Sequence, residues 1–323
     1  MQPQGAHKSR QWERMAHRGF TLVELLVVIT IIGILIALVS TAVASAMTTA
    51  REASILTEIN SMASALETYK NDYGVPPDFS PYDPGSDQNW SVAGGPEQTY
   101  GQVVVAKHLN KRFSSSVIFD IASVQAGVQA AYGLSFSSLD PAEALVFWLG
   151  GFSDVANSRL LGFNADKGFP LNPGGVRTDP LYDFDPTRLA DQDGDGWFEY
   201  YPDDPDTSLP YVYFASRGDE SYAPLPPLGD IQYAMYPHYQ TSASGYAVPY
   251  FHVLPNGSNP IGTPVNARGF QIIAAGVQDN SYSQTSVPRA ALPLFPSAAS
   301  GWLDGDNDNL TNFHTGNLEK GLD

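Results

Sequence analysis

The sequence contains no cysteine, and it is poor in basic residues. Without cysteine the chain can form no disulfide, no thiolate nucleophile and no cysteine-ligated zinc site. Its 17 Lys and Arg residues face 34 Asp and Glu residues, which gives a formal net charge of -17. Because nucleic-acid binding needs patches of Lys and Arg against the phosphates, this balance argues against a nucleic-acid partner.

The chain also lacks recognisable catalytic motifs. It contains no H-E-x-x-H, G-x-S-x-G, P-loop or G-x-G-x-x-G pattern. Its six histidines are scattered, and no two of them have the spacing of metal ligands. We therefore expect a protein that is not an enzyme. Hydrophobic residues still make up 43% of the chain, which excludes wholesale disorder.

What the chain does have is a basic N-terminus followed by a long apolar run. Residues 1–19 carry a net charge of +3, which leaves -20 on the rest of the chain. From Leu22 to Met47 nearly every residue is Leu, Ile, Val, Ala, Ser, Thr or Gly. About 20 such residues can cross a bilayer, and positive charge ahead of them keeps that end cytoplasmic. The pattern predicts a single membrane pass with the C-terminal part outside the cytoplasm.

An ordinary secretory signal peptide is the simpler interpretation of this run. Small residues between Ala42 and Ala46 offer two cleavage sites of the small-x-small kind. However, the run exceeds the 7–15 residues typical of the apolar core of a signal peptide, and Glu24 lies inside it. An unpaired carboxylate in a membrane costs roughly 3 kcal/mol, so Glu24 is expected to have a partner.

The helical pattern continues beyond the apolar run. Apolar and aromatic residues recur every three or four positions, which places them on one helical face: Ile55, Ile59, Met62, Leu66, Tyr69 and Tyr73. No proline interrupts this stretch, and Gly74 followed by Pro76 and Pro77 then ends it. One helix from about Phe20 to Tyr73 is therefore predicted. A cleaved signal peptide would not share such a helix with the mature domain.

The start of this helix carries a family resemblance. Gly19-Phe20-Thr21-Leu22-Val23-Glu24 and the apolar run after it resemble the cleavage and methylation motif of type IV prepilins and type II secretion pseudopilins. The resemblance implies that a prepilin peptidase cuts between Gly19 and Phe20 and methylates the new amine of Phe20. One departure is that many members have proline at the twenty-second mature position, where this chain has Thr41.

Glu24 could find its partner in the N-terminal amine of another subunit. Cleavage after Gly19 would place the charged amine of Phe20 at the membrane edge, where a staggered neighbouring helix could present Glu24 to it. An ion pair in a low-dielectric setting is stronger than one in water and offsets the cost of burying both charges. Because a wrong register would leave Glu24 unpaired, this pair would specify assembly as well as stabilise it.

The rest of the chain, residues 74–323, is predicted to form an extracytoplasmic domain. A short helix is expected after Asp140, which suits an N-cap, with Pro141 at the first position and Glu143 completing a capping box. It should end at Gly150 and Gly151. Strands are expected from the runs of apolar and aromatic residues at 211–215, 246–251 and 270–275, and less clearly at 103–105 and 117–119.

Parts of this domain extend the resemblance. Residues 210–218, residues 270–276 and the acidic loop near the C-terminus are similar to the sheet and closing loop of pseudopilins. The implied fold is α+β and pilin-like, with a long N-terminal helix packed on an antiparallel sheet. Residues at about 78–208 look like a large insertion with no counterpart in the short family members, and it favours a minor or tip subunit as the alternative within this class.

The C-terminal acidic loop is one candidate calcium site. Asp304, Asp306 and Asp308 alternate with Gly and Asn, and such a turn can surround a hard cation with oxygen atoms. By resemblance, major pseudopilins bind calcium near this position. A solvated turn without metal is the alternative.

A second acidic loop offers Asp191, Asp193 and Asp195. Together with Gly196 they match positions 1, 3, 5 and 6 of an EF-hand calcium loop. The twelfth position is Pro202 where an EF-hand has Glu, so a full EF-hand is excluded. A looser calcium loop and a solvated turn both stay open.

The sequence thus predicts a structural subunit of a type II secretion pseudopilus or a type IV pilus. Residues 1–19 are the leader, residues 20–73 the helix and residues 20–47 its transmembrane part. The protein is expected in the bacterial inner membrane, with its N-terminus cytoplasmic and its C-terminal domain periplasmic or extracellular. Its expected partners are prepilin peptidase and other subunits of a homo-oligomeric filament. The alternative is a membrane-anchored binding module, for example for carbohydrate, that uses a prepilin-type signal.

Overall fold

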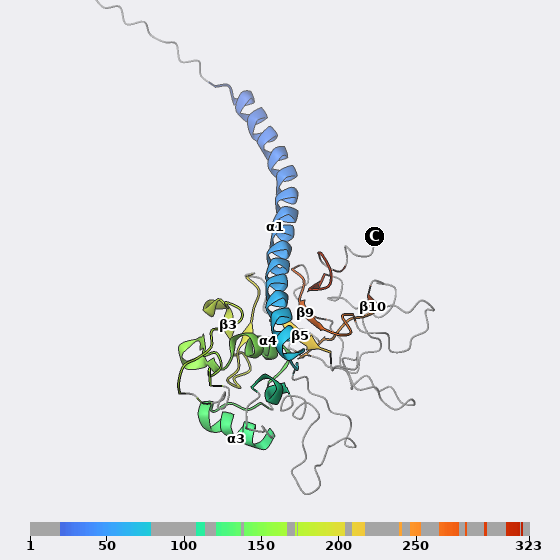
Figure 1. Ribbon diagram of the computed structural model, residues 1–323. Helices are drawn as coiled ribbons and strands as arrows, with labels where there is room; N and C mark the ends of the chain where they lie inside the picture. The colour runs from blue at the N-terminus through green and yellow to red at the C-terminus, as the bar shows by residue number, and fades with distance from the viewer. Residues whose placement is uncertain are drawn as a thin grey trace, which may run out of the picture. The chain divides into compact units, whose positions relative to one another are not determined.

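The computed structural model has an α+β fold, as predicted (Figure 1). By contacts between residues it divides into two units, Met1–Met47 and Thr48–Asp323, and each is considered by itself. The structure describes residues 20–78, 108–113, 121–136, 139–166, 172, 174–203, 209–216, 239–240, 246–252, 265–277, 282, 294–295, 308–316 and 318.

The N-terminal helix is confirmed. Helix α1 runs from Leu22 to Tyr73. It stops at Gly74, which has a φ of 84° and donates its N–H to the carbonyl of Lys70 over 2.8 Å. Glycine adopts this left-handed conformation without the strain that a side chain adds, so it suits the residue after a helix.

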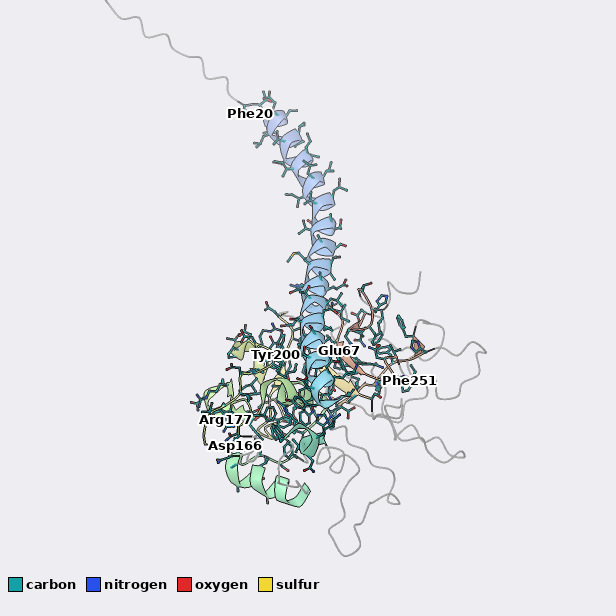
Figure 2. The ribbon with its side chains drawn as sticks, in the orientation of Figure 1. Phe20, Glu67, Asp166, Arg177, Tyr200 and Phe251 are labelled. Carbon is teal, nitrogen blue, oxygen red and sulfur yellow. The ribbon has the colours of Figure 1, made fainter. Side chains whose placement is uncertain are left out.

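In the first unit, α1 is apolar and exposed on every side. All residues from Phe20 to Met47 are exposed, and 74% of Phe20 is accessible. Figure 2 shows side chains projecting from this part of the helix in all directions. Within the described chain, α1 is the one helix that is long and apolar enough to cross a membrane.

In the second unit, one face of α1 is buried. The buried residues recur at spacings of three and four, as expected for a single helical face: Glu52, Ile55, Ile59, Met62, Leu66 and Tyr69. The predicted apolar face is therefore confirmed, although Tyr73 at its end is only half-buried. Ile59, Met62 and Leu66 are fully inaccessible to solvent.

The same unit contains a three-stranded antiparallel sheet. Its order is β11–β9–β5, where β5 is Val212–Ala215, β9 is Phe270–Ala274 and β11 is Leu310–Thr311. Val212 of β5 pairs with Ile273 of β9. The strands predicted at 211–215 and 270–275 are confirmed with slightly shorter bounds.

Both faces of this sheet are buried. Tyr213 and Ile272 belong to a large apolar cluster that includes the buried face of α1, while Val212, Phe214 and Ile273 belong to a second cluster. Successive residues of a strand point to opposite faces, which explains how neighbours in sequence join different clusters. The sheet therefore lies between two apolar layers.

Helix α4, Pro141–Gly150, also contributes to this core. Its capping box forms as predicted: Asp140 Oδ1 accepts from the N–H groups of Ala142 at 2.8 Å and Glu143 at 3.1 Å, and Glu143 Oε2 accepts from Asp140 N–H at 2.9 Å. Every residue of α4 is buried. A helix that is apolar on nearly all sides is expected in a core, and α4 lies beside β4 and β5.

The remaining elements are short. Helix α3, Ile121–Tyr132, was not expected from the sequence. The strand predicted at 246–251 is wrong in extent, because two short strands flank Pro249, which has no N–H to donate to a sheet. The predicted strands at 103–105 and 117–119 lie outside the described residues. The short strands and 3-10 helices are β1 (Ser153–Asp154), β2 (Arg159–Leu160), β3 (Leu189–Ala190), β4 (Glu199–Tyr200), β6 (Tyr239–Gln240), β7 (Tyr246–Ala247), β8 (Phe251–His252), β10 (Leu294–Phe295), η1 (Val155–Asn157) and η2 (Pro186–Arg188).

Candidate functional site

The start of α1 is closed by a capping box between Thr21 and Glu24. Thr21 Oγ1 accepts from the N–H of Glu24 at 3.2 Å, and Glu24 Oε2 accepts from the N–H of Thr21 at 2.8 Å. The Thr21 hydroxyl also donates to Glu24 Oε2 at 2.7 Å. A helix leaves its first N–H groups without partners inside the helix, and this reciprocal pair satisfies two of them.

This arrangement answers in part how Glu24 is accommodated. Oε2 receives both donors from Thr21, and within the described chain no hydrogen bond reaches Oε1. Phe20 precedes the cap, and Gly19 lies outside the described residues. Since the cap uses no atom before Thr21, a cut between Gly19 and Phe20 would leave it intact.

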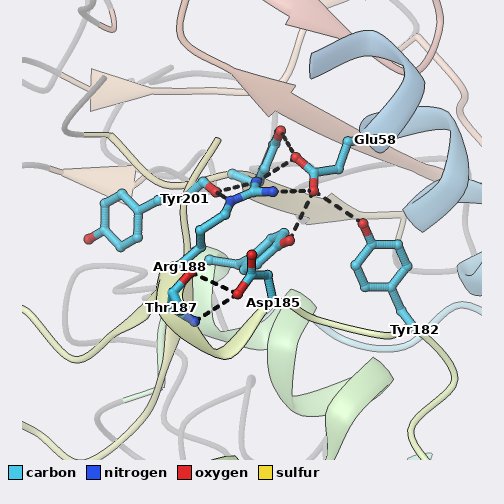
Figure 3. Close-up of polar contacts among 8 residues, drawn as sticks. Glu58, Tyr182, Asp185, Thr187, Arg188 and Tyr201 are labelled. Atoms are coloured by element: carbon cyan, nitrogen blue, oxygen red, sulfur yellow. Dashed lines mark hydrogen bonds and ion pairs between the residues drawn. The ribbon is translucent and has the colours of Figure 1, made fainter. Parts of the chain in front are cut away.

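A second carboxylate on α1, Glu58, lies at the centre of a polar cluster (Figure 3). Arg188 binds it with both terminal nitrogens, Nη1 to Oε1 at 2.8 Å and Nη2 to Oε2 at 2.5 Å. Three tyrosine hydroxyls donate to the same carboxylate: Tyr182 at 3.3 Å, Tyr200 at 2.9 Å and Tyr211 at 2.5 Å. All five donors come from residues more than 120 positions along the chain.

The cluster is electrostatically balanced. Burial raises the pKa of the Glu58 carboxyl, but the hydrogen bonds and charge of Arg188 and the hydroxyls of Tyr211 and Tyr200 outweigh this and lower it. Arg188 lies over the ring of Tyr200, 4.4 Å from the centroid, and also donates through Nε to the carbonyl of Tyr201 at 2.8 Å. The side chains of Arg188 and Glu58 are only 16% and 15% exposed. The cluster therefore joins α1 to the segment at 182–188, to residues 200–201 and to residue 211, and nothing in their sequence marked it.

The loop at 191–196 folds around the carboxylate of Asp191. Its Oδ1 accepts from Gly194 N–H at 2.8 Å and its Oδ2 from Gly196 N–H at 3.1 Å. Gly194 and Gly196 both have positive φ, 79° and 96°, which a residue with a side chain rarely adopts. The glycines thus let the loop wrap tightly enough to bring Asp193 and Asp195 together.

Glu143 joins these two aspartates from α4. One carboxylate oxygen from each of Glu143, Asp193 and Asp195 lies within 4.8 Å of the others. Burial, then the neighbouring Asp140 and Asp195, raise the pKa of the Glu143 carboxyl. Burial and Asp195 raise the pKa of Asp193 as well. Sequence reasoning identified Asp193 and Asp195 as candidate ligands but assigned Glu143 only to the helix cap.

Asp308 is the one member of the C-terminal candidate loop that the structure describes. It is 4% exposed, and its carboxylate lies so close to Gly276 that a side chain there would meet it at 1.9 Å. Asp304 and Asp306 lie outside the described residues. Calcium at this loop therefore stays a prediction.

His108 is a buried structural histidine. It is 8% exposed, and its Nε2 lies 2.8 Å from the hydroxyl of Tyr69 on α1. Burial, together with the charges of Arg112 and Lys111, lowers the pKa of His108 to about 3. The tyrosines at 200, 211 and 213 are likewise buried, which places them in the core as packing residues.

Comparison with known proteins places the N-terminus in a recognised class. Residues 14–40 match the family model of the prokaryotic N-terminal methylation motif. The matched segment contains Gly19, Phe20 and Glu24 and ends before the second unit begins. No curated protein and no solved structure matches the chain. The N-terminus is thus of the prepilin type, and it fits a membrane-anchored, pilin-like structural protein.

Proposed function

We propose that this prepilin-type protein is a filament subunit, of a type II secretion pseudopilus or a type IV pilus, that polymerises through residues 20–47 of α1. The observation that carries the proposal is a methylation motif at the start of an exposed apolar helix. From Phe20 to Met47 every residue is exposed, and every residue except Glu24 is apolar or small. A helix with apolar side chains on every face requires either lipid or other helices around it. In this proposal lipid surrounds the helix before assembly, and the helices of neighbouring subunits surround it afterwards.

Glu24 supplies the register in this proposal. Its Oε2 is held by Thr21, which leaves Oε1 to accept from a neighbouring subunit. The donor is the amine of Phe20, which exists only after cleavage behind Gly19. In a low-dielectric setting the pair is strong, and a subunit in the wrong register leaves both charges without a partner.

The processing steps follow from the motif. Prepilin peptidase cuts between Gly19 and Phe20 and methylates the Phe20 amine, while the subunit is in the bacterial inner membrane with its N-terminus in the cytoplasm. The second unit, residues 48–323, is then carried to the periplasmic or extracellular side on the outside of the filament. Its acidic composition suits that exposed position, because like-charged surfaces keep proteins soluble.

Mass spectrometry of the mature protein tests the processing step. We expect the purified chain to begin with N-methylated Phe20. A chain that begins at Ser45 or Met47 would instead show removal by signal peptidase, and the filament proposal would be abandoned.

A pair of variants tests the role of Glu24 in assembly. Glu24→Gln retains an acceptor for Thr21 but removes the charge, whereas Thr21→Ala removes the hydroxyl part of the cap but retains the charge. In cells that supply the other filament components, we expect Glu24→Gln to be cleaved normally and yet to be lost from the sheared, sedimentable filament fraction. Thr21→Ala should still enter that fraction. The competing hypothesis of an anchored binding module predicts no such difference between the two variants.

A further inference from the structure

The carboxylates of Glu143, Asp193 and Asp195 converge from two separate elements. Glu143 extends from the first turn of α4, and the two aspartates lie on the loop before β4. One oxygen from each lies within 4.8 Å of the others, so the three groups repel one another whenever they are ionised. Glu143 is 1% exposed, so water does little to separate these charges.

Two of the three carboxylates have an oxygen atom that the described residues leave unused. Asp195 Oδ1 accepts from Trp197 N–H at 2.9 Å, but Asp195 Oδ2 is buried and has no hydrogen-bond partner among the residues that the structure describes. Glu143 Oε2 accepts from Asp140 N–H, and no described donor reaches Oε1. A buried oxygen without a donor is costly, and a buried carboxylate without a cation is costlier.

No Lys or Arg among the described residues fills this place. None of the Lys or Arg ion pairs between described residues involves Glu143, Asp193 or Asp195. By contrast, the mostly buried Glu58 in the same unit has a bidentate arginine and three hydroxyl donors. Among the described residues, Glu58 thus has five side-chain donors, whereas Glu143 has one backbone donor and faces two more carboxylates.

We propose that Glu143, Asp193 and Asp195 bind one calcium ion. Calcium is bound by oxygen ligands at 2.3–2.6 Å, so two ligand oxygens on opposite sides of the ion are about 5 Å apart, which accommodates the observed separations. Asp193 is exposed, which leaves a side on which water completes the coordination sphere. Asp191 does not take part, because both of its oxygens accept from loop N–H groups.

The ion would join the loop to the core. It connects the carboxylates of a glycine-containing turn to a helix whose ten residues are all buried. The proposal does not depend on filament assembly, because it concerns the second unit alone. It also differs from calcium at the C-terminal acidic loop, since it uses none of the residues there.

Thermal unfolding of the full chain in detergent micelles tests the site, with tryptophan fluorescence as the readout in chelator, in calcium and in magnesium. At saturating calcium we expect the midpoint to rise by about 5 °C or more over the chelated protein. Magnesium should have a smaller effect because it demands a regular octahedral site. No shift with calcium would overturn the proposal.

Substitutions assign the shift to this cluster. Glu143→Gln retains the acceptor for the Asp140 N–H, so the helix cap survives, and Asp193→Asn alters an exposed residue that should not impair folding. We expect both variants to lose the calcium-dependent rise. Asp179→Asn, another exposed aspartate in this unit, is the matched control and should keep the full rise. A full rise in Glu143→Gln and Asp193→Asn would place calcium elsewhere and refute the site.

Discussion

The two halves of α1 place a glutamate in opposite circumstances. Glu24 lies in the exposed, apolar half and is held through one oxygen by the residue that caps its own helix. Glu58 lies in the half with a buried face and is held by donors more than 120 residues away. Within the described residues, Glu58 has donors from distant parts of the chain, whereas the half that carries Glu24 keeps its apolar surface exposed and one carboxylate oxygen without a donor.

The largest expected difference between the halves concerns apolar packing. Ile59 is fully buried, and Ile32 is 48% exposed. We expect Ile59→Ala to destabilise the second unit by about 4 kcal/mol, through lost contacts and a cavity, and Ile32→Ala to change its stability by less than about 0.5 kcal/mol. Urea unfolding in micelles, followed by tryptophan fluorescence, measures both. Equal effects would mean that residues 22–47 also pack within the isolated chain.

Removing the partner of Glu58 should have the next largest effect. Arg188→Met leaves a mostly buried carboxylate with hydroxyl donors alone, and we expect a loss of about 3 kcal/mol. The control is Arg159→Met, which breaks the pair with Asp154 at 2.8 Å, where the arginine side chain is 62% exposed. That exposed pair should contribute less than about 1 kcal/mol. A similar cost for both would show that Glu58 does not depend on its arginine.

His108 should make the stability of the second unit depend on pH. Its folded pKa is about 3 and its ordinary value 6.5, so between these the unfolded chain binds a proton that the folded chain does not. Stability therefore falls as pH decreases, and we expect a loss of about 2 kcal/mol between pH 6.5 and pH 5. His108→Gln should remove this part of the slope, whereas substitution of the exposed His252 should not. An unchanged slope in His108→Gln would contradict the prediction.

The smallest expected effect lies at the N-terminal cap. Thr21→Ala should weaken the first turn of α1 by about 1 kcal/mol. Because this turn belongs to the first unit, we expect the unfolding of the second unit not to change. Amide hydrogen exchange at residues 22–25 should instead become roughly five times faster. Unchanged exchange would mean that the surrounding micelle, and not the cap, holds the turn.

Local patterns in the sequence were sufficient to predict the elements that depend on residues close together in the chain. The three- and four-residue spacing of Ile55, Ile59 and Met62 predicted the buried face of α1, and Asp140 with Glu143 predicted the cap of α4. The partners of Glu58 could not be predicted, because Arg188 lies 130 positions further along the chain and no local pattern links the two residues. Glu143 was missed as a member of the acidic cluster because its role in the cap already explained its identity.

The cluster at Glu58 also limits how α1 can move. A shift of the helix by a single residue along its axis displaces the carboxylate by about 1.5 Å. The hydrogen bonds from Tyr200 and Arg188 Nη1 measure 2.9 and 2.8 Å, so a slip directed along either of them would carry it beyond the range in which a hydrogen bond holds. A pull on the N-terminal end of α1 is therefore resisted at Glu58 by five hydrogen bonds, which oppose axial sliding of the helix together.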